Sequence, residues 1–189
     1  RPGWPHHTDT VLHVYRAAEL GHLLRAGCFY PRWAPDFYYG YGYPIFNYYA
    51  PLTYYLANLF DLLPGVNVVA GVKAVFVLGF FAASLGAYLL GRELFGRAAG
   101  IMAAASFVFA PYVVFIDPYA RGVLAEHFAI CLLPLVFYAF HRLMSGVGGR
   151  GALLGSVLSL AALVCSHNLI GPVAGGLLLA YWLWIVVFA

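Results

Sequence analysis

Charged residues are scarce in this chain of 189 residues. Asp, Glu, Lys and Arg make up 9% of the sequence, whereas hydrophobic residues make up 63%. So few charges cannot solvate the surface of a water-soluble globule of this length. The composition therefore excludes a soluble domain and predicts an integral membrane protein.

Basic runs and paired cysteines are missing as well. The ten Lys and Arg residues give a net charge of +3, but they are spread thinly and form no run that would follow a nucleic-acid backbone. Nucleic acid is therefore not an expected partner. The three cysteines, Cys28, Cys131 and Cys165, have neither CxxC metal spacing nor an even-numbered disulfide framework.

The two ends of the sequence also lack familiar signals. It begins at Arg1 without a signal-peptide pattern, and it stops at Ala189 inside an apolar stretch. We therefore expect a fragment of a longer polytopic protein, whose remaining transmembrane helices would be partners of this one.

Aromatic residues, in contrast, are concentrated in one region. Fourteen of them lie between Phe29 and Phe60. Tyr and Trp rings collect at the headgroup level of a membrane, and the Gly and Pro residues among them prevent one continuous helix. We expect residues 1–65 to form an outer, aromatic-rich loop lying on the bilayer, with an amphipathic helix over residues 8–26 that Thr8 caps.

Apolar segments follow this loop to the end of the sequence. About twenty apolar residues are needed to cross roughly 30 Å of hydrocarbon. Five segments reach or approach this length, so the sequence predicts an all-α, polytopic transmembrane helix bundle. The expected spans are residues 66–90, 98–116, 123–140, 152–166 and 169–189.

The connections between these spans differ in charge. Arg92 and Arg97 follow the first span, and Arg142 and Arg150 follow the third. Positively charged short loops are typically cytoplasmic. Residues 1–65 and the turns at 117–122 and 166–168 then share the outer face with almost all acidic and histidine side chains. Their convergence predicts a site there, although loops that are simply polar would give the same distribution.

One face of the first helix carries three ionisable groups. Asp9, His13 and Arg16 are spaced i, i+4 and i+7. Asp9 could be a general base or a metal ligand, and His13 its co-ligand or orienting partner. Alternatively, Asp9 is only favoured by the helix dipole. His6 and His7 are adjacent and point to different sides, so they are not expected to share an ion.

Further candidates lie near the outer ends of the spans. Arg121 could hold a phosphate bidentately, and Lys73 could meet one at the headgroup level or merely snorkel to the interface. Glu126, His127 and His167 lie at one depth on two neighbouring hairpins. They predict a polar substrate pocket or, alternatively, a proton path.

Four segments together resemble a known family. They are TDTVLHVYRAAEL, YPRWAPDFYYGYGYPIFNYYAPLTYYLA, PYARGVLAEHFA and SHNL. Their order resembles the bacterial multi-pass membrane proteins labelled 6-pyruvoyl-tetrahydropterin-synthase-related, which are similar to GT-C glycosyltransferases. In such enzymes the first outer loop begins with a catalytic Asp, a position that Asp9 matches.

The resemblance implies transfer of a sugar from a polyprenyl-phosphate donor to an acceptor outside the inner membrane, with inversion. Asp9 would take the acceptor proton, and Arg121 with Lys73 or His167 would hold the departing phosphate. The aromatic loop, including Tyr41 and Tyr43, would stack on the sugar and the isoprenoid tail.

Two questions stay open at this point. A paired-acid DxD motif is absent, so a divalent metal would need Asp117 or Glu126, which we otherwise count as substrate-binding residues. We expect a metal-independent site without a cofactor. The alternatives to a glycosyltransferase are a transporter or flippase for lipid-linked glycans, which needs no base, and a non-catalytic envelope scaffold.

Overall fold

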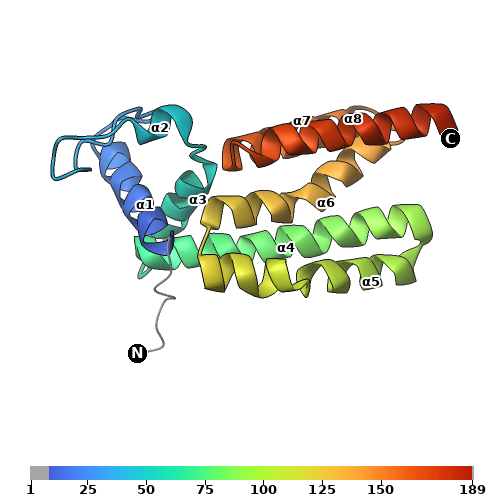
Figure 1. Cartoon of the computed structure of the whole chain (residues 1–189), viewed down its shortest axis with the longest axis horizontal. Coiled ribbons are helices and arrows are strands. Elements are labelled where there is room, and N and C mark those ends of the chain that lie inside the picture. Colours follow the sequence, from blue (N-terminus) through green and yellow to red (C-terminus); the bar gives the residue numbers. More distant parts are fainter. Residues whose placement is uncertain (1–8, 189) are drawn as a thin grey trace.

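The structure is a computed structural model that describes residues 9–188, and the regular elements in this range are helices (Figure 1). His6, His7 and Thr8 lie outside the described residues. The elements are α1 (Thr10–Arg25), α2 (Ile45–Tyr48), α3 (Leu52–Asp61), α4 (Val68–Phe95), α5 (Arg97–Val108), the π-helix η1 (Tyr112–Arg121), α6 (Leu124–Met144), α7 (Gly149–Ser166) and α8 (Ile170–Phe188).

Five helical segments are long and apolar enough to cross a membrane. They are Val68–Phe95, Arg97–Arg121, Leu124–Met144, Gly149–Ser166 and Ile170–Val187. The prediction of an all-α, polytopic membrane protein is thereby confirmed. The fourth segment begins at Gly149 and is longer than the sequence indicated, while the second consists of α5 and η1 in succession.

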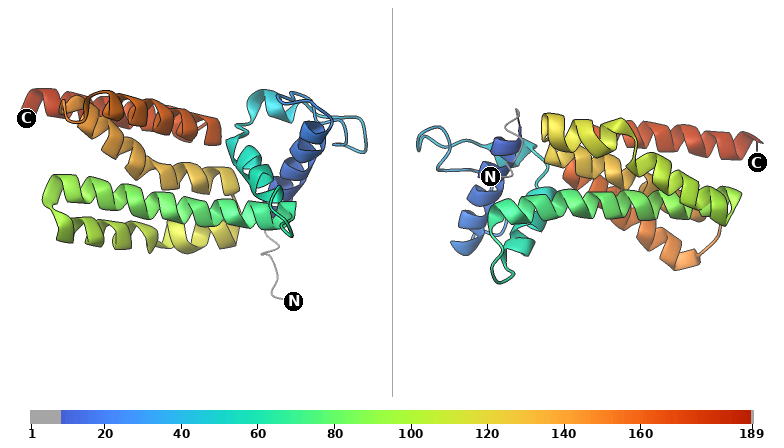
Figure 2. Two further views of the ribbon diagram at one scale, coloured as in Figure 1. Left: turned by 180° about the vertical axis from the view of Figure 1, so that it is seen from behind. Right: turned by 90° about the horizontal axis from the view of Figure 1, so that it is seen from below.

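These long helices run side by side, and α1 and α3 cross one end of the bundle (Figure 1). The views in Figure 2 show the same arrangement from behind and from below. The start of α4, the turn between η1 and α6, and the turn between α7 and α8 all meet at this end. The aromatic loop 27–44 lies beyond α1 and α2, farther from the long helices than either.

Glycines of α4 let both the crossing helix α3 and the long helix α6 approach closely. A Cβ atom on Gly71 of α4 would collide with the carbonyl oxygen of Ala57 in α3, and one on Gly86 would collide with the backbone of Leu135 in α6. Small residues let helix backbones approach in this way. The end formed by α1–α3 is therefore attached closely to the long helices.

The π-helix η1 replaces part of a turn that the sequence led us to expect. Residues 117–121 continue the second long segment, and the chain reverses only at Gly122, which has a φ of +67°. Pro118 lies inside η1 and has no N–H to donate to an α-helical ladder. A wider helix with i→i+5 bonding accommodates it, and π-helices of this kind are frequent at functional sites.

Candidate functional site

An arginine fork occupies the turn between η1 and α6. The guanidinium of Arg121 donates from Nη1 and Nη2 to the two carboxylate oxygens of Glu126, each over 2.9 Å. Such bidentate pairs are among the strongest charge-assisted contacts in proteins. They leave the Nε–H and the second Nη2–H, which form a side fork that fits another carboxylate or a phosphate. Arg121 is 42% exposed, so this fork can be reached by a ligand.

A buried carboxylate supports the same arginine. Asp117 Oδ1 accepts a hydrogen bond from Arg121 Nη1 over 3.2 Å, and the Asp117 side chain is only 1% exposed. Its second oxygen, Oδ2, is buried and has no hydrogen-bond partner among residues 9–188. Since a buried carboxylate is costly without a partner, Arg121 is needed to stabilise Asp117 as well as to bind Glu126.

Tyr112 completes this group, although sequence analysis did not identify it as a site residue. Its hydroxyl donates to Glu126 Oε1 over 2.6 Å and also accepts a bond from Arg121 Nη1. Nine residues separate Tyr112 from Arg121, which in an α-helix is two and a half turns and places them on opposite faces. The wider winding of η1 brings them together. We call Tyr112, Asp117, Arg121 and Glu126 the Arg121 cluster.

The first turn of α1 packs against Gly122, the residue that follows Arg121 in the chain. A Cβ atom on Gly122 would overlap the hydroxyl of Thr10, which is itself buried. This contact brings Asp9, the residue before Thr10, next to the turn that carries Arg121. Asp9 occupies the N-cap position of α1, yet within the described chain its side chain makes no capping hydrogen bond. A capping hydrogen bond therefore does not explain Asp9, whereas the helix dipole still favours a carboxylate at this position.

His13 is held inside the protein. Its side chain is 1% exposed, and Nδ1 lies 2.8 Å from the Tyr54 hydroxyl, which also accepts a bond from Arg16. Burial, together with smaller effects of the charges of Arg16 and His167, lowers the pKa of His13 to about 3. His13 is therefore neutral at physiological pH. It can position its neighbours but is a poor proton acceptor, which favours the orienting role over the catalytic one.

His167 interacts electrostatically with both His13 and the Arg121 cluster. Its Nδ1 accepts the backbone N–H of Ile170 over 3.3 Å, so the neutral ring carries its proton on Nε2 as a free donor. Burial lowers the pKa of His167, which the Glu126 carboxylate opposes and the Arg121 charge reinforces. These electrostatic interactions, together with that between His167 and His13, connect α1, α6 and the α7–α8 turn.

Asn168 connects the α7–α8 turn to residues 48–50, which follow the aromatic loop, and sequence analysis did not identify this role. Its Oδ1 accepts the N–H of Ala50 over 3.1 Å, and its Nδ2 donates to the carbonyl of Tyr48. The SHNL motif thus supplies both a donor at the site, His167, and an anchor for the segment beside it.

Three of the predicted site residues, His127, Tyr41 and Tyr43, lie apart from the Arg121 cluster. His127 points to the other side of α6, with its ring against Phe76 and Phe80 of α4 and Nε2 3.5 Å from Cys131 Sγ. The common pocket expected for Glu126 and His127 does not form, because consecutive helical residues face different directions. Lys73 is exposed on α4, and Tyr41 is 86% exposed in the loop 27–44. Tyr43 lines a cavity beside α1.

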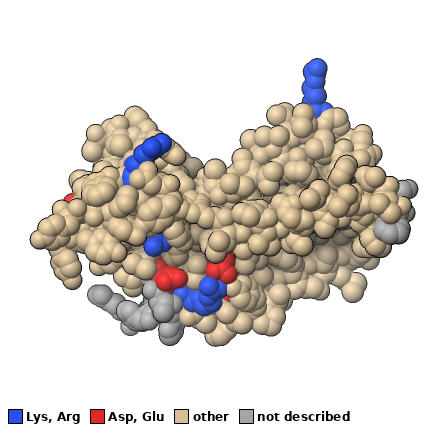
Figure 3. Space-filling model, turned by 45° about the horizontal axis from the view of Figure 1, so that its top comes forward, with Lys and Arg blue, Asp and Glu red and all other residues tan. Residues whose placement is uncertain are grey.

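The charged side chains of this region form a visible group. On the face shown in Figure 3, acidic and basic side chains lie together at one place, and most of the surrounding surface is uncharged. Within residues 9–188, no three His, Cys, Asp or Glu side chains are grouped as a metal site would require. Metal independence remains a prediction.

Comparison with known proteins identifies a family. A family model described as "6-pyruvoyl-tetrahydropterin synthase related domain; membrane protein" matches residues 46–189. No curated protein matches the chain. No solved structure matches it either.

Proposed function

The chain belongs to the 6-pyruvoyl-tetrahydropterin-synthase-related membrane proteins, and we propose that it is a GT-C-like glycosyltransferase of a bacterial inner membrane. It transfers a sugar from a polyprenyl-phosphate donor to an acceptor on the outer face. The observation that supports this proposal is the contact between Thr10 and Gly122, the chain neighbours of Asp9 and Arg121, which joins segments more than a hundred residues apart.

The proposed reaction assigns one task to each of these groups. The acceptor hydroxyl gives its proton to the Asp9 carboxylate while its oxygen bonds to the anomeric carbon. The bond from that carbon to the phosphate oxygen breaks, and its electron pair leaves with the phosphate. The side fork of Arg121 stabilises the charge that develops there, and His167 donates from Nε2. Attack opposite the leaving phosphate inverts the anomeric centre.

The surroundings support a lipid-linked donor. The Arg121 cluster lies at the end of helices that are apolar along their length, so a headgroup phosphate can reach Arg121 while an isoprenoid chain stays in hydrocarbon. The face opposite, at Arg92, Arg97, Arg142 and Arg150, is the arginine-rich one. By the positive-inside rule it is cytoplasmic, which leaves the Arg121 cluster on the outer side.

One observation favours a different function, a transporter for lipid-linked glycans. The second long segment is interrupted between α5 and η1 and contains the buried Asp117. Broken helices and buried carboxylates are typical of transport pathways. A transporter would use Arg121 in the same way but would not need Asp9 as a base.

The test is Asp9→Asn in the full-length protein, supplied with a panel of radiolabelled polyprenyl-phosphate hexoses. Asn keeps the size and polarity of Asp but cannot take the proton, so transfer should fall by at least about 10²-fold with donor binding retained. The matched control is Asp61→Asn, which changes an acid at the end of α3 that pairs with Arg25 of α1. This variant should transfer normally. Transfer by Asp9→Asn near the wild-type rate would exclude the base and favour the transporter.

A further inference from the structure

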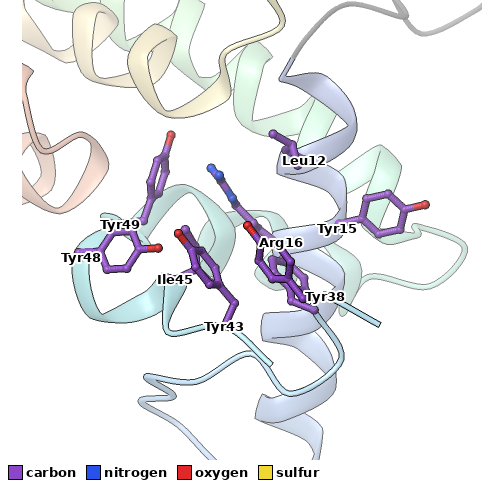
Figure 4. Close-up of a pocket in the computed structure, with 9 residues that line it drawn as sticks. Leu12, Tyr15, Arg16, Tyr38, Tyr43, Ile45, Tyr48 and Tyr49 are labelled. Atoms are coloured by element: carbon purple, nitrogen blue, oxygen red, sulfur yellow. The ribbon is translucent and has the colours of Figure 1, made fainter. Parts of the chain in front are cut away.

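The cavity that Tyr43 lines belongs to the extramembranous part and lies away from the Arg121 cluster. It has a volume of about 540 Å³, within the range of small-molecule sites. It opens between α1 and the chain from Phe37 to Tyr49 (Figure 4). Its lining residues are Leu12, Tyr15, Arg16, Phe37, Tyr38, Tyr43, Ile45, Tyr48 and Tyr49.

The wall of this cavity is fixed by backbone contacts. Ala34 and Tyr43 exchange two backbone hydrogen bonds of 2.8 and 2.9 Å, which close the aromatic loop. Tyr38 holds a φ of +52°, a conformation that a bulky residue adopts only when its surroundings impose it. The Asn168 side chain then fixes the backbone on either side of Tyr49. The cavity is therefore preformed.

Tyrosine rings give the cavity a particular chemistry. In Figure 4 the rings of Tyr43 and Tyr48 lie beside each other, and they pack edge to face with centroids 5.9 Å apart. A tyrosine ring offers a flat apolar face and a hydroxyl that donates or accepts. The apolar C–H face of a pyranose packs on such rings while its hydroxyls bond to theirs. This combination fits a carbohydrate better than it fits a hydrocarbon chain.

Arg16 adds a positive charge without a matching negative one. Its guanidinium lies 4.3 Å from the centroid of the Tyr49 ring and donates to the Tyr54 hydroxyl. Across residues 9–188 no carboxylate forms an ion pair with it, and no acid lines the cavity. A half-buried guanidinium without a counter-ion is a site for an anion, and its fork fits a carboxylate or a phosphate.

We propose that this cavity binds an acidic sugar, with the tyrosines holding the ring and Arg16 holding its carboxylate or phosphate. The inference rests on the proposed function, because it names the acceptor as a glycan that carries such a sugar. Arg16 is seven residues from Asp9 along the same face of α1, or about 10 Å. A disaccharide anchored at Arg16 therefore extends a hydroxyl to Asp9.

The test measures binding rather than transfer. Full-length protein in nanodiscs is titrated with a glucuronic-acid-containing disaccharide, its neutral glucose counterpart, and the neutral disaccharide carrying a phosphate, and saturation-transfer NMR reports binding. We expect at least one acidic ligand to bind about tenfold more tightly than the neutral one. The ligand that binds most tightly identifies the acidic group.

Variants separate this proposal from its alternatives. Arg16→Gln should reduce the ratio of the affinities for acidic and neutral ligands to about one. Arg25→Gln changes an exposed arginine of the same helix and should leave this ratio unchanged. Tyr48→Leu should weaken acidic and neutral ligands alike. The proposal is overturned if the wild type binds neither acidic ligand more tightly than the neutral one. It is also overturned if the preference for an acidic ligand survives in Arg16→Gln. The readout is binding and requires no transfer, so a failure of the proposed transfer reaction does not affect this result.

Discussion

Arg121 pairs with two carboxylates that differ in burial. Glu126 is partly exposed, but Asp117 is buried and has one oxygen without a partner in the described chain. The same guanidinium therefore stabilises the fold through Asp117 and remains available to a ligand through its side fork. A loss of activity in an Arg121 variant would by itself not distinguish the two roles.

A double substitution makes this distinction. Arg121→Ala alone should lower the free energy of unfolding by roughly 1 to 3 kcal/mol, because Asp117 loses its counter-ion in a buried position. Adding Asp117→Asn should restore most of that stability, while binding of polyprenyl phosphate stays weak. Thermal unfolding in detergent and titration with the lipid measure the two quantities. Recovery of lipid binding in the double variant would show that Arg121 acts only on the fold.

His13 makes stability depend on pH. In the unfolded chain a histidine takes up a proton near pH 6.5, but in the folded protein burial lowers the pKa of His13 to about 3. Between these values the unfolded state holds more protons, so stability decreases as the pH falls below 6.5 and is unaffected above it. At pH 5 the cost is about 2 kcal/mol.

Melting temperatures at pH 7.5 and pH 5 test this prediction. His13→Gln should lose less stability on acidification than the wild type, since it removes one buried group that must stay neutral. His22→Gln, on the exposed side of the same helix, should behave like the wild type. An unchanged response to pH in His13→Gln would refute the assignment.

At the scale of single elements, the docking of α1 on the Gly122 turn decides the site. Gly122 has a positive φ and no room for a Cβ atom beside Thr10. Gly122→Ala therefore combines backbone strain with a displacement of α1. Gly27→Ala has a similar positive φ but nothing within 4 Å of the added atom, so it carries the strain alone.

The difference between these two variants isolates the contact. Both should lose about 1 kcal/mol of stability or somewhat more. Only Gly122→Ala should also reduce transfer, by about tenfold or more, because Asp9 moves away from Arg121. Equal activity in the two variants, measured with the labelled donors, would mean that the docking of α1 does not position Asp9.

Sequence analysis predicted some of these elements and missed others. The apolar runs are long enough to identify the five spans, and the spacing of Asp9, His13 and Arg16 placed them on one face of a helix. The winding of η1 was not predicted, because no residue pattern distinguishes i→i+5 from i→i+4 bonding. Tyr112 was missed for that reason. Asn168 was missed because its role depends on contacts with residues 48–50, which sequence spacing cannot show.

For the whole molecule, the main prediction concerns sidedness. In a background without Cys28, Cys131 and Cys165, a membrane-impermeant thiol reagent should label Asp36→Cys and Tyr119→Cys from outside. Phe95→Cys and Val147→Cys should react only after permeabilisation. All four positions are exposed, so accessibility follows from topology. The reverse pattern would place the Arg121 cluster in the cytoplasm and exclude a donor on the outer leaflet.

The link from Asn168 to Tyr48 and Ala50 has a consequence for biosynthesis. Chains are made from the N-terminus, so the aromatic loop is synthesised more than a hundred residues before Asn168. The backbone around Tyr49 gains its two hydrogen-bond partners only when the α7–α8 turn has been threaded through the membrane. Until then the cavity between α1 and residues 37–49 lacks one of its fixed walls. A chain released too early would expose an incomplete site. The α7–α8 hairpin thus controls the completion of a segment that is made well before it.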